Sequence, residues 1–297
     1  MIIIARDFSV TYKSVEELTY NLEKRVLERT SRLNEQKKEL KFRNDRINES
    51  IDYASKIQHS MLPSQDVFKE LFPESFVFYQ PRDVLSGDFY FVDKVNYRGN
   101  ECSVVVAADC TGHGIPGAMM SMMGNSMLHK LLQREVDKSP GNILTKLDRS
   151  IQFELKQKET NNQDGMDISI AYVDKENKVI HYATANSYIA YVKDEEMATV
   201  RGENFGVGGV KEEEVTFSTR VIEWKKSMKL YMFSDGFQDQ FGGSKGRKFQ
   251  RGKFHQLLKD ISGLAPQSQH ESIANSFEFW KGNNDQVDDI LILGLQF

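Results

Sequence analysis

Aspartates stand at the ends of short apolar runs at four places in this chain. They are Asp88 before FYFV, Asp109 after SVVVAA, Asp235 after KLYMFS, and the pair Asp288 and Asp289 before ILIL. Runs this short and this rich in Val, Ile, Phe and Tyr predict buried strands, so each carboxylate lies where a strand leaves the sheet and meets water. Hard divalent cations prefer such oxygen ligands. The pattern therefore predicts a metal site of the kind that a two-metal hydrolase needs.

Glycines accompany three of these aspartates. In SGDFYF, Ser86 and Gly87 allow a tight turn before the strand, and in ADCTGHGIPGA three glycines follow Asp109. Glycine lets backbone carbonyls approach an ion or a phosphate closely. Pro116 is well placed as the first residue of a following helix. The alternative interpretation of this second segment is a plain connection from a strand to a helix.

The composition is that of a globular protein with some solvated helix, because 39% of the 297 residues are apolar and 28% are charged. A net charge of −4 gives no basic field, so we expect no nucleic-acid partner. Two cysteines, Cys102 and Cys110, make no disulfide framework and indicate a reducing compartment. The start MIIIARDF has too few apolar residues for a signal peptide or a membrane span, which predicts a cytoplasmic location.

The sequence changes character near residue 61. From about Ser14 to Ser60 it contains no proline or glycine and is dense in charged and amide residues. Apolar residues recur there every seven positions, at Val26, Leu33, Leu40, Ile47, Ala54 and Met61. The companion seam is mostly polar, with Leu22, Arg29, Gln36, Arg43, Ser50 and Ile57. We therefore expect residues 1–60 to form a coiled-coil linker that pairs two chains weakly and serves signalling, with a solitary or spacer helix as the alternative.

Residues 61–297 have the pattern of one α+β domain. The expected strands are 76–80, 88–92, 103–108, 168–173, 179–183, 188–192, 229–234 and 290–295. The expected helices are 116–136, 141–158, 251–262 and 270–280. Strands come in neighbouring groups with helices between the groups, which favours antiparallel sheets covered by helices.

Five segments together carry a family resemblance. They are SGDFYF, ADCTGHGIPGA, DGMDISIA, FSDGFQDQFGG and QVDDILIL. Their order and spacing resemble those of the metal-dependent protein phosphatases, the protein phosphatase 2C superfamily, in its bacterial SpoIIE and RsbU branch. The resemblance covers roughly residues 52–297. It implies an α-β-β-α sandwich of two antiparallel sheets flanked by helices, with the metals at one rim.

The resemblance also implies roles for single residues. Asp109 corresponds to a carboxylate that bridges two Mn²⁺ or Mg²⁺ ions, and the backbone carbonyl of Cys110 to the ligand beside it. Asp88 corresponds to a ligand of the second metal, and Asp235 and Asp288 to the remaining ligands of the first. Four further residues have weaker correspondences. They are Asp289 as a neighbour of the ligands, Asp164 and Asp167 as candidates for a third metal or as turn residues, and Arg82 as the cation that holds the phosphate or as a surface arginine.

The implied activity is serine/threonine protein phosphatase, a hydrolase that acts on phosphoric monoesters through a metal-activated water. In this branch the usual substrates are phosphorylated antagonists of anti-sigma factors, small proteins of the STAS fold. Relatives commonly carry an upstream sensor or membrane module, which would hold the chain at the inner face of the membrane. Lys245, Arg247 and Lys248 could face such a phosphoprotein. Two alternatives stay open: a catalytically silent pseudophosphatase that only binds partners, and a two-metal phosphodiesterase or nuclease.

Overall fold

The computed structural model describes the backbone of residues 2–297 and the side chains from Tyr12 onward. Residues Ala54–Phe297 form one compact unit, and the described residues before Ala54 form another. Helix α1, Ile2–Met61, begins in the first unit and ends in the second. Among the described residues, no helix is long and apolar enough to cross a membrane.

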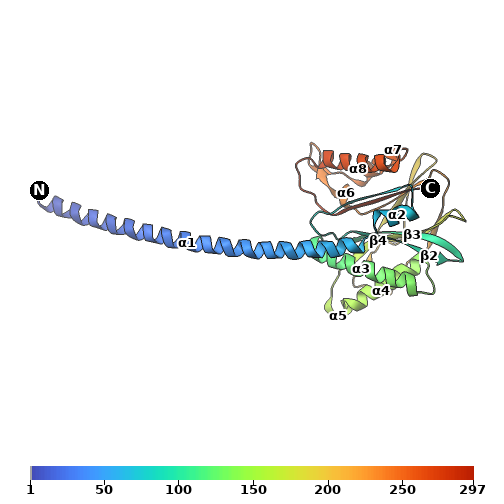
Figure 1. Ribbon diagram of the computed structural model, residues 1–297, viewed down its shortest axis with the longest axis horizontal. Coiled ribbons are helices and arrows are strands. Elements are labelled where there is room, and N and C mark those ends of the chain that lie inside the picture. The colour runs from blue at the N-terminus through green and yellow to red at the C-terminus, as the bar shows by residue number, and fades with distance from the viewer. Residues whose placement is uncertain (1) are drawn as a thin grey trace. The chain divides into compact units, whose positions relative to one another are not determined.

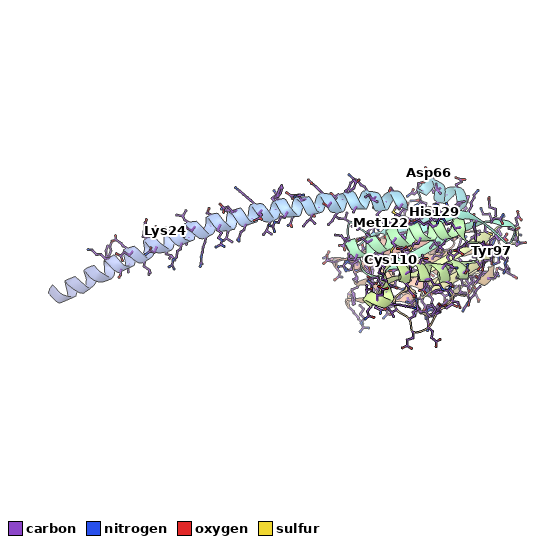
Figure 2. The ribbon with its side chains drawn as sticks, turned by 90° about the horizontal axis from the view of Figure 1, so that it is seen from below. Lys24, Asp66, Tyr97, Cys110, Met122 and His129 are labelled. Atoms are coloured by element: carbon purple, nitrogen blue, oxygen red, sulfur yellow. The ribbon has the colours of Figure 1, made fainter. Side chains whose placement is uncertain are left out.

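The part of α1 before Ala54 is a solvated helix. Figure 2 shows its side chains, Lys24 among them, projecting along the whole described length. Four apolar residues at seven-residue intervals, Val26, Leu33, Leu40 and Ile47, are 55–64% exposed. An uninterrupted helix of this length is consistent with the absence of proline and glycine from Ser14 to Ser60, since those residues interrupt helices.

The second unit contains two sheets. The first has the order β1 (Ser75–Gln80), β13 (Ile290–Gln296), β10 (Lys229–Phe233), β6 (Tyr188–Lys193) and β7 (Glu196–Arg201). The second has the order β2 (Phe89–Tyr97), β3 (Asn100–Cys110), β4 (Gly165–Asp174), β5 (Val179–Ala185) and β9 (Arg220–Glu223), and β8 (Val207–Gly208) pairs with β4. All these pairs are antiparallel. A short hairpin joins β11 (Phe241–Gly242) to β12 (Arg247–Lys248).

Helices cover both outer faces of the paired sheets (Figure 1). On one side lie α3 (Gly114–Arg134) and α4 (Pro140–Glu154), followed by the short α5 (Gln157–Thr160). On the other lie α7 (Arg251–Ile261) and α8 (Pro266–Lys281). Two short helices, α2 (Gln65–Leu71) and α6 (Gly236–Asp239), complete the unit. The expected α-β-β-α sandwich, preceded by a long helix, is confirmed.

Alternate side chains of the central strands fill different layers of the core. On β3, Val104 and Val106 pack toward α3 and α4, while Val105 packs between the sheets. On β13, Leu291 and its alternate neighbours pack between the sheets, whereas Ile292 packs toward α7 and α8. Both faces of these strands are buried, which explains why they are continuous apolar runs in the sequence. Each fully buried aliphatic side chain contributes roughly 1.5–3 kcal/mol relative to exposure.

All eight expected strands are present, within a few residues at each end. The sequence did not reveal β7 or β9. Half of their side chains are polar or charged, and all except Ile222 are partly or fully exposed, so neither strand has a long apolar run. Residues 141–158 were expected as one helix, but α4 ends at Glu154 and α5 starts at Gln157, because Lys156 adopts a left-handed conformation with φ of 48°.

Candidate active site

The aspartates that interrupt the apolar runs lie at one rim of the sandwich and come from both sheets. Asp88 directly precedes β2, and Asp109 lies next to the last residue of β3. Asp235 follows β10 and caps α6, and Asp288 precedes β13. The negative charges of Asp235 and Asp288 both act on Asp109. The two sheets therefore bring together carboxylates that are up to 200 residues apart in the chain.

Asp88 is the most buried of these carboxylates, at 1% exposure. Its Oδ2 accepts a hydrogen bond of 2.6 Å from the Ser234 hydroxyl, but its Oδ1 has no partner in the described part of the chain. Burial raises the pKa of the Asp88 carboxyl well above its usual range, and the charge of Asp109 raises it further. A buried carboxylate with one unpaired oxygen is unfavourable unless a cation or a proton compensates it.

Asp109 and Asp167 are paired residues of the neighbouring strands β3 and β4. Desolvation raises the pKa of the Asp109 carboxyl, and the charges of Asp235 and Asp288 add to this effect. Burial also raises the pKa of Asp167, to about 6, although the Asn186 amide donates a hydrogen bond of 2.7 Å to its Oδ2. The rim is therefore a region of mutual repulsion between carboxylates in the absence of a cation.

Asp289 holds the loop that carries Asp88. Its two carboxylate oxygens accept hydrogen bonds of 2.7 Å each from the backbone amides of Arg82 and Gly87. A Cβ at Gly87 would lie 2.7 Å from the Gly112 carbonyl oxygen and 3.2 Å from that of Cys110. The loop before β2 therefore packs directly on the backbone after β3, and only glycine allows this approach. The Cys110 carbonyl, one of the predicted ligands, lies on this side of the rim.

Gln58, near the end of α1, supports the same loop. Its Nε2 donates to the Ser86 carbonyl at 2.5 Å and to the Ser121 hydroxyl at 2.9 Å, and its Oε1 accepts from the Ser86 amide at 3.1 Å. The side chain is 3% exposed. The Ser86 hydroxyl in turn accepts from the Asp88 amide at 3.0 Å. Sequence analysis did not identify Gln58, because one glutamine in a polar helix carries no local signal.

A cavity of about 230 Å³ opens beside the carboxylates. Its lining includes Asp109, Asp167 and Asp235 together with two residues that sequence analysis missed, Asn186 and Arg201. Arg201 is at the end of β7 and is the register partner of Tyr188 on β6. The guanidinium stacks over that ring at 5.0 Å from its centroid.

Three of the predicted residues have other contacts. The Arg82 side chain is exposed and its Nη1 donates to the Val287 carbonyl at 3.0 Å. Asp164 accepts hydrogen bonds from Thr111 and Asn162, so it belongs to the turn before β4. Lys248, on the short hairpin, forms an exposed ion pair of 2.6 Å with Asp239. Like Asp88 and Asp288, Arg82 and Asp164 are not among the residues that line the cavity.

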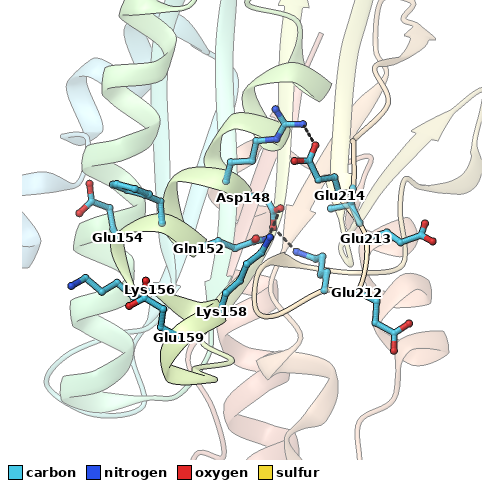
Figure 3. A pocket seen from close by; sticks show the side chains of 13 residues that line it. Asp148, Gln152, Glu154, Lys156, Lys158, Glu159, Glu212, Glu213 and Glu214 are labelled. Atoms are coloured by element: carbon cyan, nitrogen blue, oxygen red, sulfur yellow. Dashed lines mark hydrogen bonds and ion pairs between the residues drawn. The ribbon is translucent and has the colours of Figure 1, made fainter.

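The structure also contains a larger cavity of about 560 Å³ away from the rim. It lies between α4, α5 and the segment that contains Glu212, Glu213 and Glu214 (Figure 3). Lys211 and Asp148, which form an ion pair, are among the residues that line it. None of the predicted site residues lines this cavity. We therefore consider the smaller, carboxylate-lined cavity as the candidate active site.

In the described part of the chain, no group of three or more His, Cys, Asp or Glu side chains is arranged so that it could hold a metal ion by itself. This finding limits the kind of site that the rim can provide. Mg²⁺ usually keeps several water ligands and takes only one or two protein carboxylates directly. An open and hydrated site is thus compatible with the arrangement, whereas a dehydrated cage of side chains is not.

Comparisons with known proteins agree with this fold. The Stage II sporulation protein E (SpoIIE) family matches residues 99–297, about two thirds of the chain. No curated protein matches in sequence.

Among solved structures, the SiaA-PP2C domain of Pseudomonas aeruginosa is 27% identical, with a TM-score of 0.77, and the match covers 86% of this chain and 98% of that one. The PP2C phosphatase domain of SpoIIE from Bacillus subtilis is 15% identical over 75% of this chain and 63% of that one, with a TM-score of 0.60. RsbX in complex with magnesium is 16% identical over 75% and 94%, with a TM-score of 0.52. The chain thus belongs to the SpoIIE family of metal-dependent protein phosphatases and has their PP2C-type fold.

Proposed function

We infer that this chain is a metal-dependent phosphatase that hydrolyses phosphoserine or phosphothreonine on a signalling protein. The observation that carries the proposal is the interacting pair of Asp88, which is buried, and Asp109, which is half-buried. Desolvation raises the pKa of both carboxyl groups; the charge of Asp109 adds to the effect at Asp88, and the charges of Asp235 and Asp288 add to it at Asp109. Asp88 Oδ1 has no hydrogen-bond partner among the described residues. Divalent cations would relieve this repulsion and pair the free oxygen.

The donor set fits Mn²⁺ or Mg²⁺. Carboxylate and carbonyl oxygens are the ligands that hard cations prefer. The proposed ligands are Asp88, Asp109, the Cys110 carbonyl, Asp235 and Asp288, and Asp167 is better placed than Asp164 for a third ion because it lines the cavity. Bound ions would supply Lewis acidity and a hydroxide nucleophile at neutral pH.

The other residues of the rim orient these ligands. The Ser234 hydroxyl fixes one oxygen of Asp88, and the Leu291 amide donates to that hydroxyl at 2.9 Å. Asp289 is not proposed as a metal ligand but as a neighbour of the ligands, because both of its oxygens already accept hydrogen bonds from backbone amides. Gln58 holds the Ser86 backbone from both sides, which fixes where the loop enters β2.

The test is an assay of purified protein with Mn²⁺ against a phosphoserine peptide, an aryl phosphate and single-stranded DNA. The proposal expects phosphate release from the first two substrates and inhibition by a chelator. The Asp109→Asn variant should lose this activity. Cleavage of DNA would instead favour the phosphodiesterase alternative. Absence of turnover with every metal would favour the pseudophosphatase, in which the domain only binds a partner.

The proposed substrate is a phosphorylated STAS-type antagonist of an anti-sigma factor. The family membership supports this choice. The exposed basic residues Lys245, Arg247 and Lys248, on and beside the β11–β12 hairpin, are the proposed docking contacts. Reversal of these charges should raise KM for the phosphoprotein and leave hydrolysis of an aryl phosphate unchanged. An equal effect on both substrates would exclude the docking role.

We assign residues 1–60 to signalling and to pairing with a second copy of the chain, and residues 61–297 to catalysis. The exposed stripe of Val26, Leu33, Leu40 and Ile47 supports the pairing, because a second copy would bury it. The polar companion seam, with Arg29 and Gln36, would keep the dimer weak. A weak dimer is one that an upstream sensor or membrane module could shift. The location of such a protein would be cytoplasmic, or at the inner face of the membrane if the sensor lies there.

A further inference from the structure

The candidate active site contains one guanidinium whose environment is unusual. Arg201 lines the carboxylate cavity, and its side chain is only partly exposed. Its Nε is buried and donates no hydrogen bond within the described residues, where the side chain also forms no ion pair within 4.0 Å. A buried donor of a charged group that stays unpaired is unfavourable, so the cavity is completed by a ligand that accepts a hydrogen bond there.

The position of Arg201 is fixed by two contacts of its side chain, one of them with a residue that is itself bound to the rim. Its Nη2 donates to Asn186 Oδ1 at 2.7 Å, and Asn186 Nδ2 donates to Asp167 Oδ2 at the same distance. The guanidinium also stacks on the ring of Tyr188. The amide of Asn186 therefore connects the arginine to the carboxylate rim and sets the direction of its remaining N–H groups. These contacts use only Nη2 and the flat face of the guanidinium, so the Nε–H group is left for a ligand.

The cavity leaves a second polar atom unpaired. Gln238 lines the same space, and its buried Oε1 accepts no hydrogen bond from the described residues. A suitable occupant thus offers acceptors to Arg201 and a donor to Gln238. A phosphorylated serine or threonine within a peptide has both, since its phosphate oxygens accept and its backbone N–H donates.

We propose that Arg201 binds the phosphate of the substrate, with Asn186 as the residue that positions it. This inference rests on the proposed function, because an anion enters a cavity lined by Asp109 and Asp167 only when cations neutralise them. The planar fork of arginine suits phosphate oxygens better than a lysine does. Arg82, for which the resemblance left open a phosphate-binding role or a place on the surface, donates to the Val287 carbonyl outside this cavity.

The test compares Arg201→Met and Arg201→Lys with Arg251→Met as the matched control. Arg251 stacks on the same Tyr188 ring at 4.7 Å but does not line the cavity. Two readouts are needed: KM and kcat for a phosphoserine peptide and an aryl phosphate, and calorimetric binding of inorganic phosphate to the Mn²⁺-loaded protein. The second readout does not depend on turnover, and thermal melting verifies that each variant is folded.

For Arg201→Met we expect kcat/KM to fall roughly ten- to a hundredfold with both substrates, and the Kd of phosphate to rise by a similar factor, as the loss of a hydrogen bond to a charged group implies. Arg201→Lys should recover only part of this loss, and Arg251→Met should match the wild type. The inference is overturned if folded Arg201→Met binds phosphate with the same Kd as the wild type. It is also overturned if kcat/KM falls for the peptide but not for the aryl phosphate. A wild type without turnover would refute the proposed function instead, and the phosphate titration would still decide the role of Arg201.

Discussion

Neutralising Asp167 should stabilise the metal-free protein in a pH-dependent way. Burial and the charge of Asp235 raise the pKa of this carboxyl from 3.8 to about 6 in the folded protein. The substitution Asp167→Asn removes the charge but keeps an oxygen that can accept the 2.7 Å hydrogen bond from Asn186. The difference between the two proteins therefore reports on the cost of a charge at this position, to which desolvation contributes most and the charge of Asp235 adds.

The sign and size of the expected stability change follow from the pKa values of Asp167 in the folded and unfolded states. A carboxyl whose pKa is higher in the folded state stabilises the fold fully below the unfolded value of 3.8, and this contribution is lost as the pH rises through about 6. One pKa unit corresponds to about 1.4 kcal/mol. Between pH 8 and pH 5, wild type should gain about 1–2 kcal/mol of unfolding free energy from Asp167 alone, and Asp167→Asn should lack this gain.

The assay is urea unfolding in the presence of a chelator at pH 5 and pH 8. Glu196→Gln is the control, because Glu196 is an exposed carboxylate on β7. We expect the stability of Asp167→Asn relative to wild type to be higher at pH 8 than at pH 5 by about 1–2 kcal/mol, and Glu196→Gln to show no such change. If Asp167→Asn differs from wild type by the same amount at both pH values, the pKa of Asp167 is not raised in the folded protein as described.

Three further predictions concern the ions, the loop and the helix. Mn²⁺ at a hundred times its Kd should raise the unfolding free energy of wild type by about 2.7 kcal/mol, measured as a higher Tm. The Tm of Asp109→Asn should rise much less, and an equal rise in both proteins would count against the metal site. Gln58→Leu should destabilise the protein by about 1–3 kcal/mol and lower kcat, because it leaves the buried Ser86 backbone unpaired; unchanged unfolding and turnover would show that this contact is dispensable. Leu33→Lys with Leu40→Lys should give a monomer in sedimentation; a monomeric wild type would leave the helix as a spacer.

The strands and the aspartates at their ends could be predicted because their signals are local. A strand buried on both faces must be apolar along its length, as in Leu291 and Ile292 of β13, so a carboxylate next to it marks the point where the strand reaches water. Strand β7, whose side chains are all partly or fully exposed, has no such constraint, and no apolar run marks it in the sequence. Arg201 was missed for this reason, since it lies at the end of that strand.

The supporting contacts of the site could not be predicted because they join distant parts of the chain. Gln58 binds Ser86 and Ser121, which are 28 and 63 residues away. Asp289 binds backbone amides more than 200 residues before it. These hydrogen bonds depend on the packing of the loop before β2 against the end of α1 and the start of β13. A side chain that binds a backbone amide needs no particular partner residue, so it leaves no pattern in the sequence.

Titration of the protein with Mn²⁺, followed by electron paramagnetic resonance of the free ion, tests the central claim most directly. The claim is that the rim carboxylates, Asp109 among them, would hold divalent cations. Wild type should remove about two equivalents of free Mn²⁺ per chain, as two-metal hydrolases do, and Asp109→Asn should lose tight binding of both. The account is contradicted if wild type leaves Mn²⁺ free in solution, or if Asp109→Asn binds as many ions as wild type with the same affinity.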